Sequence, residues 1–202
     1  MSMMVNSPRF SAGGGGPPFT PPVAMSLTNP GAEAGDTSGW TAASGGVVWS
    51  SINTSGSAWP STIYEGSRYF WAGSVTDARM YQDADVSAYA TTIDAGGVVA
   101  EMTCRFSTLD NLNDYFSIFV RALNSVGTVL STVSQQELRA NDLAAGWLLQ
   151  DLNLLLPSGT RSVRVEVHAT RTGGTDNDVH LDAVTLTLYS NSRRITPTFA
   201  SS

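Results

Sequence analysis

The stretch 161-RSVRVEVHAT-170 indicates the fold class of the chain more clearly than any other. Valines occupy every second position from 163 to 167, and polar or charged residues stand between them. Successive side chains of a strand point to opposite faces of a sheet, so this period of two predicts a strand with one buried face. His168 shares the polar face with Arg164 and Glu166, and we expect a solvated strand histidine rather than a base or a ligand.

Similar short apolar segments continue on both sides of this stretch. Turn-forming runs rich in Gly, Asn, Asp and Pro separate them, and a short helix is expected only within 135–144. The pattern predicts an all-β fold, a jelly-roll β-sandwich. The expected strands lie within 46–52, 68–73, 86–93, 97–107, 115–123, 127–133, 146–156, 161–170 and 184–189.

The composition of the 202-residue chain excludes several classes of protein. Hydrophobic residues make up 42% and charged residues 14%, which is not the composition of a disordered chain. The formal net charge of -6 argues against nucleic-acid binding, which needs a basic face. No stretch approaches the ~20 apolar residues of a membrane span. The single cysteine, Cys104, cannot form an intramolecular disulfide and is expected in the core.

The chain divides by composition into an extended N-terminal arm, a β-domain and a tail, at 1–25, 26–190 and 191–202. The arm contains four consecutive glycines and two Pro-Pro pairs, so it cannot form a packed core of its own. It is either a solvated leader or an assembly arm that docks on a neighbouring subunit. The apolar anchors expected for docking are Phe10, Phe19 and Val23.

Four stretches resemble, in order, segments of the galactose-binding-like jelly rolls, the fold of many carbohydrate-binding modules. They are 27-LTNPGAEAGDTSGW-40, 81-YQDADVSAYATTIDAGGVVAEMTCRFS-107, 145-AGWLLQDLNLLLPSGTRSVRVEVHATR-171 and 173-GGTDNDVHLDAVTLTL-188. The resemblance covers about residues 27–189 and implies the sandwich fold. It leaves function open, because this fold serves sugar binding, adhesion and scaffolding.

In many members of this family, a Glu of the first stretch and an Asp of the last strand bind a structural calcium ion. By position, the resemblance implies Glu33 and Asp182, with backbone carbonyl groups as further oxygen ligands. Alternatively, both carboxylates accept hydrogen bonds from backbone groups at the strand edges. The apolar phase shifts after Leu181, which predicts a β-bulge near Asp182. Three aspartates either join the site or form turns: Asp36, Asp176 and Asp178.

Aromatic residues cluster in 57-SAWPSTIYEGSRYFWAG-73. Because sugars often stack on exposed aromatic rings, this segment is the candidate glycan platform. The predicted sugar-binding residues are Trp59, Tyr69 and Trp71, with the alternative that Phe70 or Trp71 belongs to the core. Trp40 and Trp147 stand where the resembling family buries an aromatic ring, and we expect both in the core.

No nucleophile elbow, Cys-x-x-Cys pair, zinc-binding helix motif or phosphate loop is present, and we expect a protein that is not an enzyme. The sequence predicts a structural or adhesion protein of a phage or phage-like particle: a head-decoration, spike, baseplate or tail-fibre protein. The chain shows no secretory signal, and particles of this kind assemble in the host cytoplasm, so the expected location is the virion.

The expected partners are other particle proteins, bound through the N-terminal arm, and host surface glycans. We also expect a homo-oligomer in the assembly and no membrane insertion. Two alternatives remain open at this point: a stand-alone carbohydrate-binding module, and part of a polysaccharide-active enzyme.

Overall fold

The computed structural model describes residues 21–47, 49–52, 62–108, 114–138 and 146–190. Three residues predicted to bind partners or sugars, Phe10, Phe19 and Trp59, lie outside these ranges, as does the predicted tail. No helix within the described ranges is long and apolar enough to cross a bilayer.

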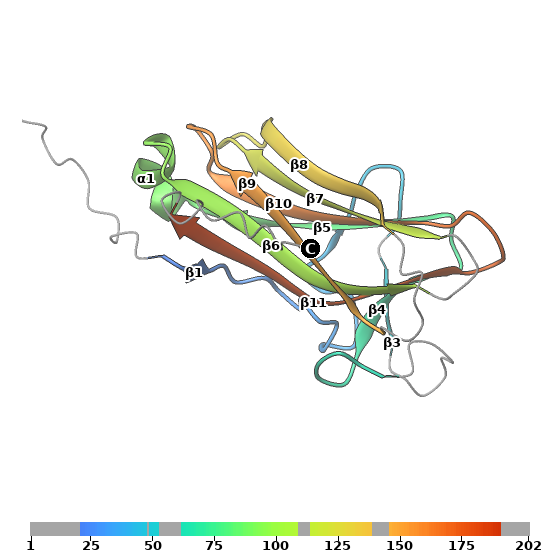
Figure 1. Ribbon diagram of the computed structural model, residues 1–202. Helices are drawn as coiled ribbons and strands as arrows, with labels where there is room; N and C mark the ends of the chain where they lie inside the picture. The colour runs from blue at the N-terminus through green and yellow to red at the C-terminus, as the bar shows by residue number, and fades with distance from the viewer. Residues whose placement is uncertain (1–20, 48, 53–61, 109–113, 139–145, 191–202) are drawn as a thin grey trace, which may run out of the picture.

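Two β-sheets pack face to face, which confirms the predicted all-β sandwich (Figure 1). In the six-stranded sheet the order is β3 (Ser50–Ile52), β4 (Tyr69–Gly73), β11 (Asn177–Ser190), β6 (Val98–Thr108) and β9 (Leu148–Leu155), with β1 (Val23–Ala24) beside β11. In the five-stranded sheet the order is β2 (Thr41–Ala42), β5 (Asp77–Asp85), β10 (Ser162–Thr170), β7 (Tyr115–Leu123) and β8 (Val129–Leu138).

The core lies between the two sheets and follows the alternation predicted for 161–170. Val163, Val165 and Val167 of β10 point inward and are 0% exposed. Cys104 is also buried, as expected, and its burial raises the pKa of the thiol. Trp40 packs edge-to-face on Phe70, with ring centroids 5.8 Å apart, which confirms its predicted place in the core.

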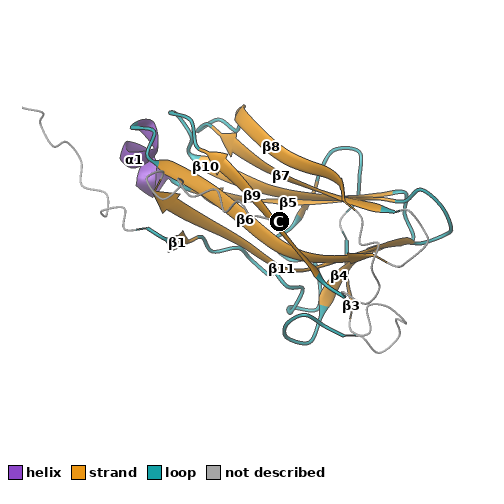
Figure 2. Cartoon of the chain, in the orientation of Figure 1, coloured by secondary structure: helices purple, strands orange, loops and turns teal. Residues whose placement is uncertain are grey.

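The strand predicted at 86–93 is wrong, because this segment forms two short helices at one end of the sandwich (Figure 2). They are η1 (Ser87–Tyr89) and α1 (Ala90–Asp94), and Ile93 is the buried residue of α1. The Asp85 carboxylate accepts a hydrogen bond from Ser87 N at 2.8 Å, which turns the chain out of β5. Gly96, at φ +76, then ends the helical segment. Of the helix expected at 135–144, the described residues up to Leu138 belong instead to β8.

The β-bulge predicted near Asp182 is confirmed. The register of β11 against β6 shifts between Asp182 and Thr185, and Ala183 has a φ of 53°. Val184 N donates to the carbonyl of Pro30 at 3.2 Å. The bulge therefore joins β11 to the turn at Pro30 and sets the direction of the Asp182 side chain.

Val23, predicted to anchor on a neighbouring subunit, instead lies in β1 opposite Leu188 of β11. Its side chain is half-buried and packs against the core of its own domain. A two-residue strand pairs with only a short part of β11, so the end of the predicted arm is held by its own sandwich.

Candidate functional site

The two predicted calcium ligands meet the same turn, at Glu65–Arg68, on the six-stranded sheet. Asp182 Oδ2 accepts a hydrogen bond from Glu65 N at 3.2 Å, and Asp182 Oδ1 accepts one from Ala183 N at 2.7 Å. Glu33 accepts hydrogen bonds from the other end of the turn, from Ser67 N at 3.0 Å and Arg68 N at 2.9 Å. Both carboxylates thus bond backbone groups, which is the alternative that the sequence left open.

Asp182 is a buried carboxylate that forms no ion pair with any described residue. It is 0% exposed, and burial raises its pKa to about 7, although the hydrogen bonds from Glu65 and Ala183 act in the opposite direction. Its cross-strand neighbour Arg105 does not neutralise it, because the Arg105 guanidinium lies 4.6 Å over the Tyr64 ring.

Two glutamates lie near Asp182, but the acids alone do not form a metal-binding group. A Cβ atom added to Gly31 would lie 3.0 Å from Asp182 Oδ1 and 3.5 Å from Glu65 Oε1, so a larger residue would crowd both carboxylates. No group of three or more His, Cys, Asp or Glu among the described residues is arranged to hold a metal ion. A calcium ion would therefore need Asp182, one of the two glutamates and backbone carbonyl oxygens. No sequence motif identifies Glu65, which stands in a turn that contains Gly66 and Ser67.

The predicted aromatic platform is not available as a set in this structure. Tyr69 is 0% exposed and lies between two rings, with its centroid 5.6 Å from Trp147 and 5.4 Å from His180. Trp147, expected in the core, is half-buried over this face, and its Nε1 donates to the carbonyl of Thr62 at 2.8 Å. Trp71 is half-buried, so of the described pair only this ring keeps some exposure.

His180 is an interior side chain of the same face. It is 3% exposed, and burial lowers its pKa to about 3, so the ring is neutral at ordinary pH. Its Nδ1 has no hydrogen-bond partner among the described residues. A buried, neutral histidine beside Tyr69 contributes packing and is not placed to meet a ligand.

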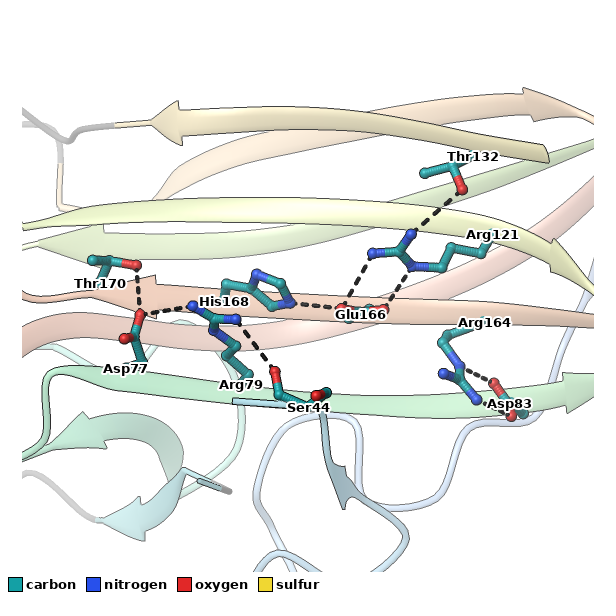
Figure 3. A network of polar contacts seen from close by, with 10 residues as sticks. All are labelled: Ser44, Asp77, Arg79, Asp83, Arg121, Thr132, Arg164, Glu166, His168 and Thr170. Carbon is teal, nitrogen blue, oxygen red and sulfur yellow. Dashed lines mark hydrogen bonds and ion pairs between the residues drawn. The ribbon is translucent and has the colours of Figure 1, made fainter. Parts of the chain in front are cut away.

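The outer face of the five-stranded sheet is different, because polar and aromatic side chains line it in rows. One row crosses the strands through residue pairs that are in direct register: Tyr81 with Glu166, Glu166 with Phe119, and Phe119 with Ser134. We call this row, together with Asp77, Arg79, Asp83, Arg121, Arg164 and His168, the polar face; Figure 3 shows Glu166 and these charged residues. Neighbouring strands are ~4.8 Å apart, so the two aromatic residues stand ~10 Å apart with a carboxylate between them.

Glu166 connects the centre of the polar face. Its carboxylate accepts hydrogen bonds from Arg121 Nε at 2.7 Å and Arg121 Nη2 at 3.3 Å, and His168 Nε2 lies 2.6 Å from Oε1 (Figure 3). The side chain is 7% exposed, and this burial alone would raise its pKa. The hydrogen bonds with His168 and Arg121 outweigh burial and lower the pKa to about 2.

Planar side chains stack along the strands of the polar face. The Phe119 ring lies 4.9 Å from the Arg121 guanidinium and 4.5 Å from the His168 ring. The Arg164 guanidinium lies 3.5 Å over the Tyr81 ring. Such contacts are attractive and help to fix the orientation of the arginines.

Two further ion pairs extend the polar face along β5. Arg164 donates to both oxygens of Asp83, at 2.7 and 2.8 Å. Arg79 donates to Asp77 Oδ1 at 3.1 Å and to the carbonyl of Ser44 at 3.2 Å (Figure 3). The period of two correctly placed Arg164, Glu166 and His168 on one polar face, but their partners come from β5 and β7, whose registers against β10 no sequence pattern supplied.

The chain was compared with protein families, with curated proteins and with solved structures, and only solved structures are similar to it. No family model matches the chain, and no curated protein sequence is similar to it. Among solved structures, the tailspike protein 4 enzymatically active domain of bacteriophage CBA120 has a TM-score of 0.58 and 13% identity. That match covers 82% of this chain and 21% of the tailspike chain, so this chain spans about a fifth of it.

Two other similar structures are matched over nearly their whole length. TmCBM61, solved in complex with β-1,4-galactotriose, has a TM-score of 0.52 and 14% identity, over 83% of this chain and 99% of that chain. A cyclase from Fischerella sp. TAU has a TM-score of 0.59 and 13% identity, over 83% of this chain and 98% of that chain. The likeness at these identities shows the fold alone: the β-sandwich of this chain is one that a carbohydrate-binding module, a phage tailspike and a cyclase also contain.

Proposed function

We propose that the protein is a non-enzymatic carbohydrate-binding protein and that the polar face of the five-stranded sheet is its binding surface. The observation that carries the proposal is the row from Tyr81 to Phe119, where two partly exposed aromatic rings flank a fixed carboxylate. Sugar rings present both apolar C–H faces and hydroxyl groups, and this row offers apolar edges beside charged hydrogen-bonding groups.

The structural neighbours support this proposal without deciding it. TmCBM61 shares the fold and was solved with a bound galacto-oligosaccharide. The Fischerella cyclase shares the same fold, so an enzymatic role is the competing possibility at the level of the fold. The pairing of the charged groups favours binding over catalysis, because Glu166 is held ionised by Arg121 and His168 rather than kept near neutrality as a proton donor.

A glycan array probed with the full chain tests the proposal, followed by calorimetry with the ligands that bind and with β-1,4-galactotriose. Phe119→Ala should weaken binding about tenfold, because it removes an apolar edge of the row and the ring against which Arg121 and His168 pack. Trp71→Ala removes the partly exposed ring of the rival platform on the other sheet, and it should bind as the wild type does if the polar face is the binding surface. A blank array for the wild type, or equal losses for both variants, would contradict the proposed surface.

We further propose that the protein acts as a component of a phage or phage-like particle. The similarity to a domain of a bacteriophage tailspike protein supports this role, since that phage protein contains a similar sandwich. The arm at 1–25 would make the contact with other particle proteins, although Val23 is held by its own domain. Deletion of residues 2–20 should leave the sandwich folded and abolish incorporation into particles, as measured by mass spectrometry of purified particles; normal incorporation would contradict the role of the arm.

We also propose a structural calcium ion at Asp182. The unpaired, buried carboxylate and the adjacent Glu33 and Glu65 supply the charge that a divalent cation would neutralise. The ion would hold the Glu65–Arg68 turn against β11 and has no role on the polar face, which belongs to the other sheet.

A further inference from the structure

The arginines of the polar face are held by one edge of the guanidinium and leave the other edge open. Arg164 uses Nε and Nη2 to bind Asp83, and its Nη1 makes no hydrogen bond with any described residue. Arg121 likewise uses Nε and Nη2 for Glu166, while its Nη1 has one long contact of 3.5 Å to Thr132 Oγ1. The two side chains keep exposures of 23% and 25%, so solvent reaches them.

The central carboxylate of the same network, Glu166, has little acceptor capacity left. Glu166 already takes three hydrogen bonds and is 7% exposed, and Asp83 takes two from Arg164. A guanidinium group has five N–H donors, of which Arg164 uses two here. The hydrogen bonds that this network can still form with a ligand are therefore mainly donated by N–H groups.

An open guanidinium edge has the geometry to bind a carboxylate through two parallel hydrogen bonds. Arg164 is also fixed in place, by both oxygens of Asp83 and by its stacking at 3.5 Å on Tyr81. Binding to a side chain that is already ordered loses little rotamer entropy. The network balances three guanidinium groups against three carboxylates, whereas the whole chain carries a net charge of -6, so an anionic ligand meets less repulsion at this network than the net charge of the chain implies.

We propose that the ligand of the polar face is an acidic glycan, whose sugar carboxylate binds the open Nη1/Nη2 edge of Arg164. This inference rests on the proposed function and narrows its ligand class. It assigns Arg164 to reading the acidic group and Asp83 to positioning Arg164. A neutral sugar can offer this edge hydroxyl acceptors but not the two parallel, charged acceptors of a carboxylate.

The test compares oligosaccharides that carry uronate or sialate residues with the same oligosaccharides after reduction of their carboxyl groups. Calorimetry with the full chain, in chelator at low and moderate salt, should give at least about tenfold tighter binding of the acidic forms, weakening with salt. Arg164→Lys keeps the charge but loses the planar edge, and should reduce the affinity for the acidic form about tenfold with an unchanged melting temperature. Arg105→Lys, on the other sheet, is the control and should bind as the wild type does.

The outcomes separate this inference from the function on which it rests. Equal binding of acidic and reduced forms would overturn the acidic class while leaving carbohydrate binding intact. Full affinity of Arg164→Lys for the acidic form would overturn the assignment of Arg164. Binding of neither form would overturn the proposed function itself, and equally tight binding of poly-glutamate would show that the face reads anions rather than glycans.

Discussion

Glu166 and Asp182 are both buried carboxylates on the outer faces of the two sheets, but they have opposite electrostatic surroundings. Glu166 has Arg121 and His168 within hydrogen-bond distance, and its pKa is lowered to about 2. Asp182 has only backbone donors, and its pKa is raised to about 7. Each lies beside a strand that carries an arginine, but Arg105 turns to Tyr64 while Arg121 turns to the carboxylate.

The difference shows that burial does not decide the charge of a carboxylate; the direction of the nearest cationic side chain does. On the five-stranded sheet, the charges are neutralised internally and form a rigid surface. On the six-stranded sheet, Asp182 forms no ion pair with any described residue. The first carboxylate is therefore neutralised by the protein itself, and the second is not.

The largest expected effect comes from the pH dependence of Asp182 in metal-free protein. Its pKa when folded, about 7, lies above the ordinary value of 3.8, so the folded state binds this proton more tightly. The resulting contribution to the free energy of unfolding is complete below about pH 4 and is lost as the pH rises to about 7. Between about pH 4 and pH 7, the free energy of unfolding of the wild type should fall by on the order of 4 kcal/mol on account of this group. Asp182→Asn should not show this fall, as measured by urea unfolding in chelator.

Calcium sharpens the same experiment. At about pH 7, calcium at a hundredfold excess over its Kd should stabilise the wild type by about 2.7 kcal/mol and so raise its melting temperature. The melting temperature of Asp182→Asn should not change with calcium. Glu166 gives the opposite slope, since its lowered pKa adds stability that disappears as the pH falls from about 4.5 to about 2. Parallel pH profiles for the wild type and Asp182→Asn would show that the two carboxylates do not differ as described.

The second effect is the loss of Glu166 itself. Glu166→Gln leaves Arg121 and His168 without their shared carboxylate, and removal of one partner of a largely buried ion pair should cost about 3 kcal/mol. Asp83→Asn is the control, because the Asp83 side chain is 38% exposed and its loss should cost less than about 1 kcal/mol. Equal losses in guanidinium chloride unfolding would contradict a distinction based on burial.

The smallest effect concerns the turn that carries Glu33. A Cβ atom at Gly66, where φ is +64, would lie 2.4 Å from the Glu33 carboxyl carbon, so Gly66→Ala must displace this side chain from Ser67 and Arg68. Gly127→Ala has the same kind of φ, +82, with no atom within 4 Å. Gly66→Ala should therefore be less stable than Gly127→Ala by about 1 kcal/mol in thermal unfolding; equal stabilities would show that the Glu33 bonds contribute nothing.

The sequence predicted the sandwich and several local features because each depends on neighbours in the chain. The alternation of 161–170, the bulge at Asp182 and the burial of Cys104 all follow from periodicity or residue type, and the structure contains them. The strand predicted at 86–93 is wrong for a physical reason. Alternating apolar residues in a short run fit a strand, but the hydrogen bond from Ser87 N to the Asp85 carboxylate turns the chain at the end of the sandwich, where the helical turns follow.

The candidate site could be predicted only in part, because its contacts depend on strand register. Glu33 and Asp182 are 149 positions apart, and the Glu65 turn that connects them became visible only in three dimensions. Tyr69 looked like a surface aromatic by alternation, but Trp147, in the bend just before β9, packs against its ring. The row from Tyr81 to Phe119 required the alignment of three strands, which no local pattern encodes.

The pairing of β1 with β11 gives the domain a defined response to mechanical load. Val23 lies opposite Leu188 and Ala24 opposite Thr187, so the start of β1 and the end of β11 leave the sheet at the same end. Tension between residue 21 and residue 190 would break the hydrogen bonds between β1 and β11 one after another, in an unzipping geometry, instead of loading them all at once in shear. β11 is 14 residues long and is hydrogen-bonded to β4 on one side and to β6 on the other, so it would stay in place. A force applied to the N-terminal side would therefore release β1 from β11, and so extend the chain that precedes the sandwich, before the sandwich itself unfolded.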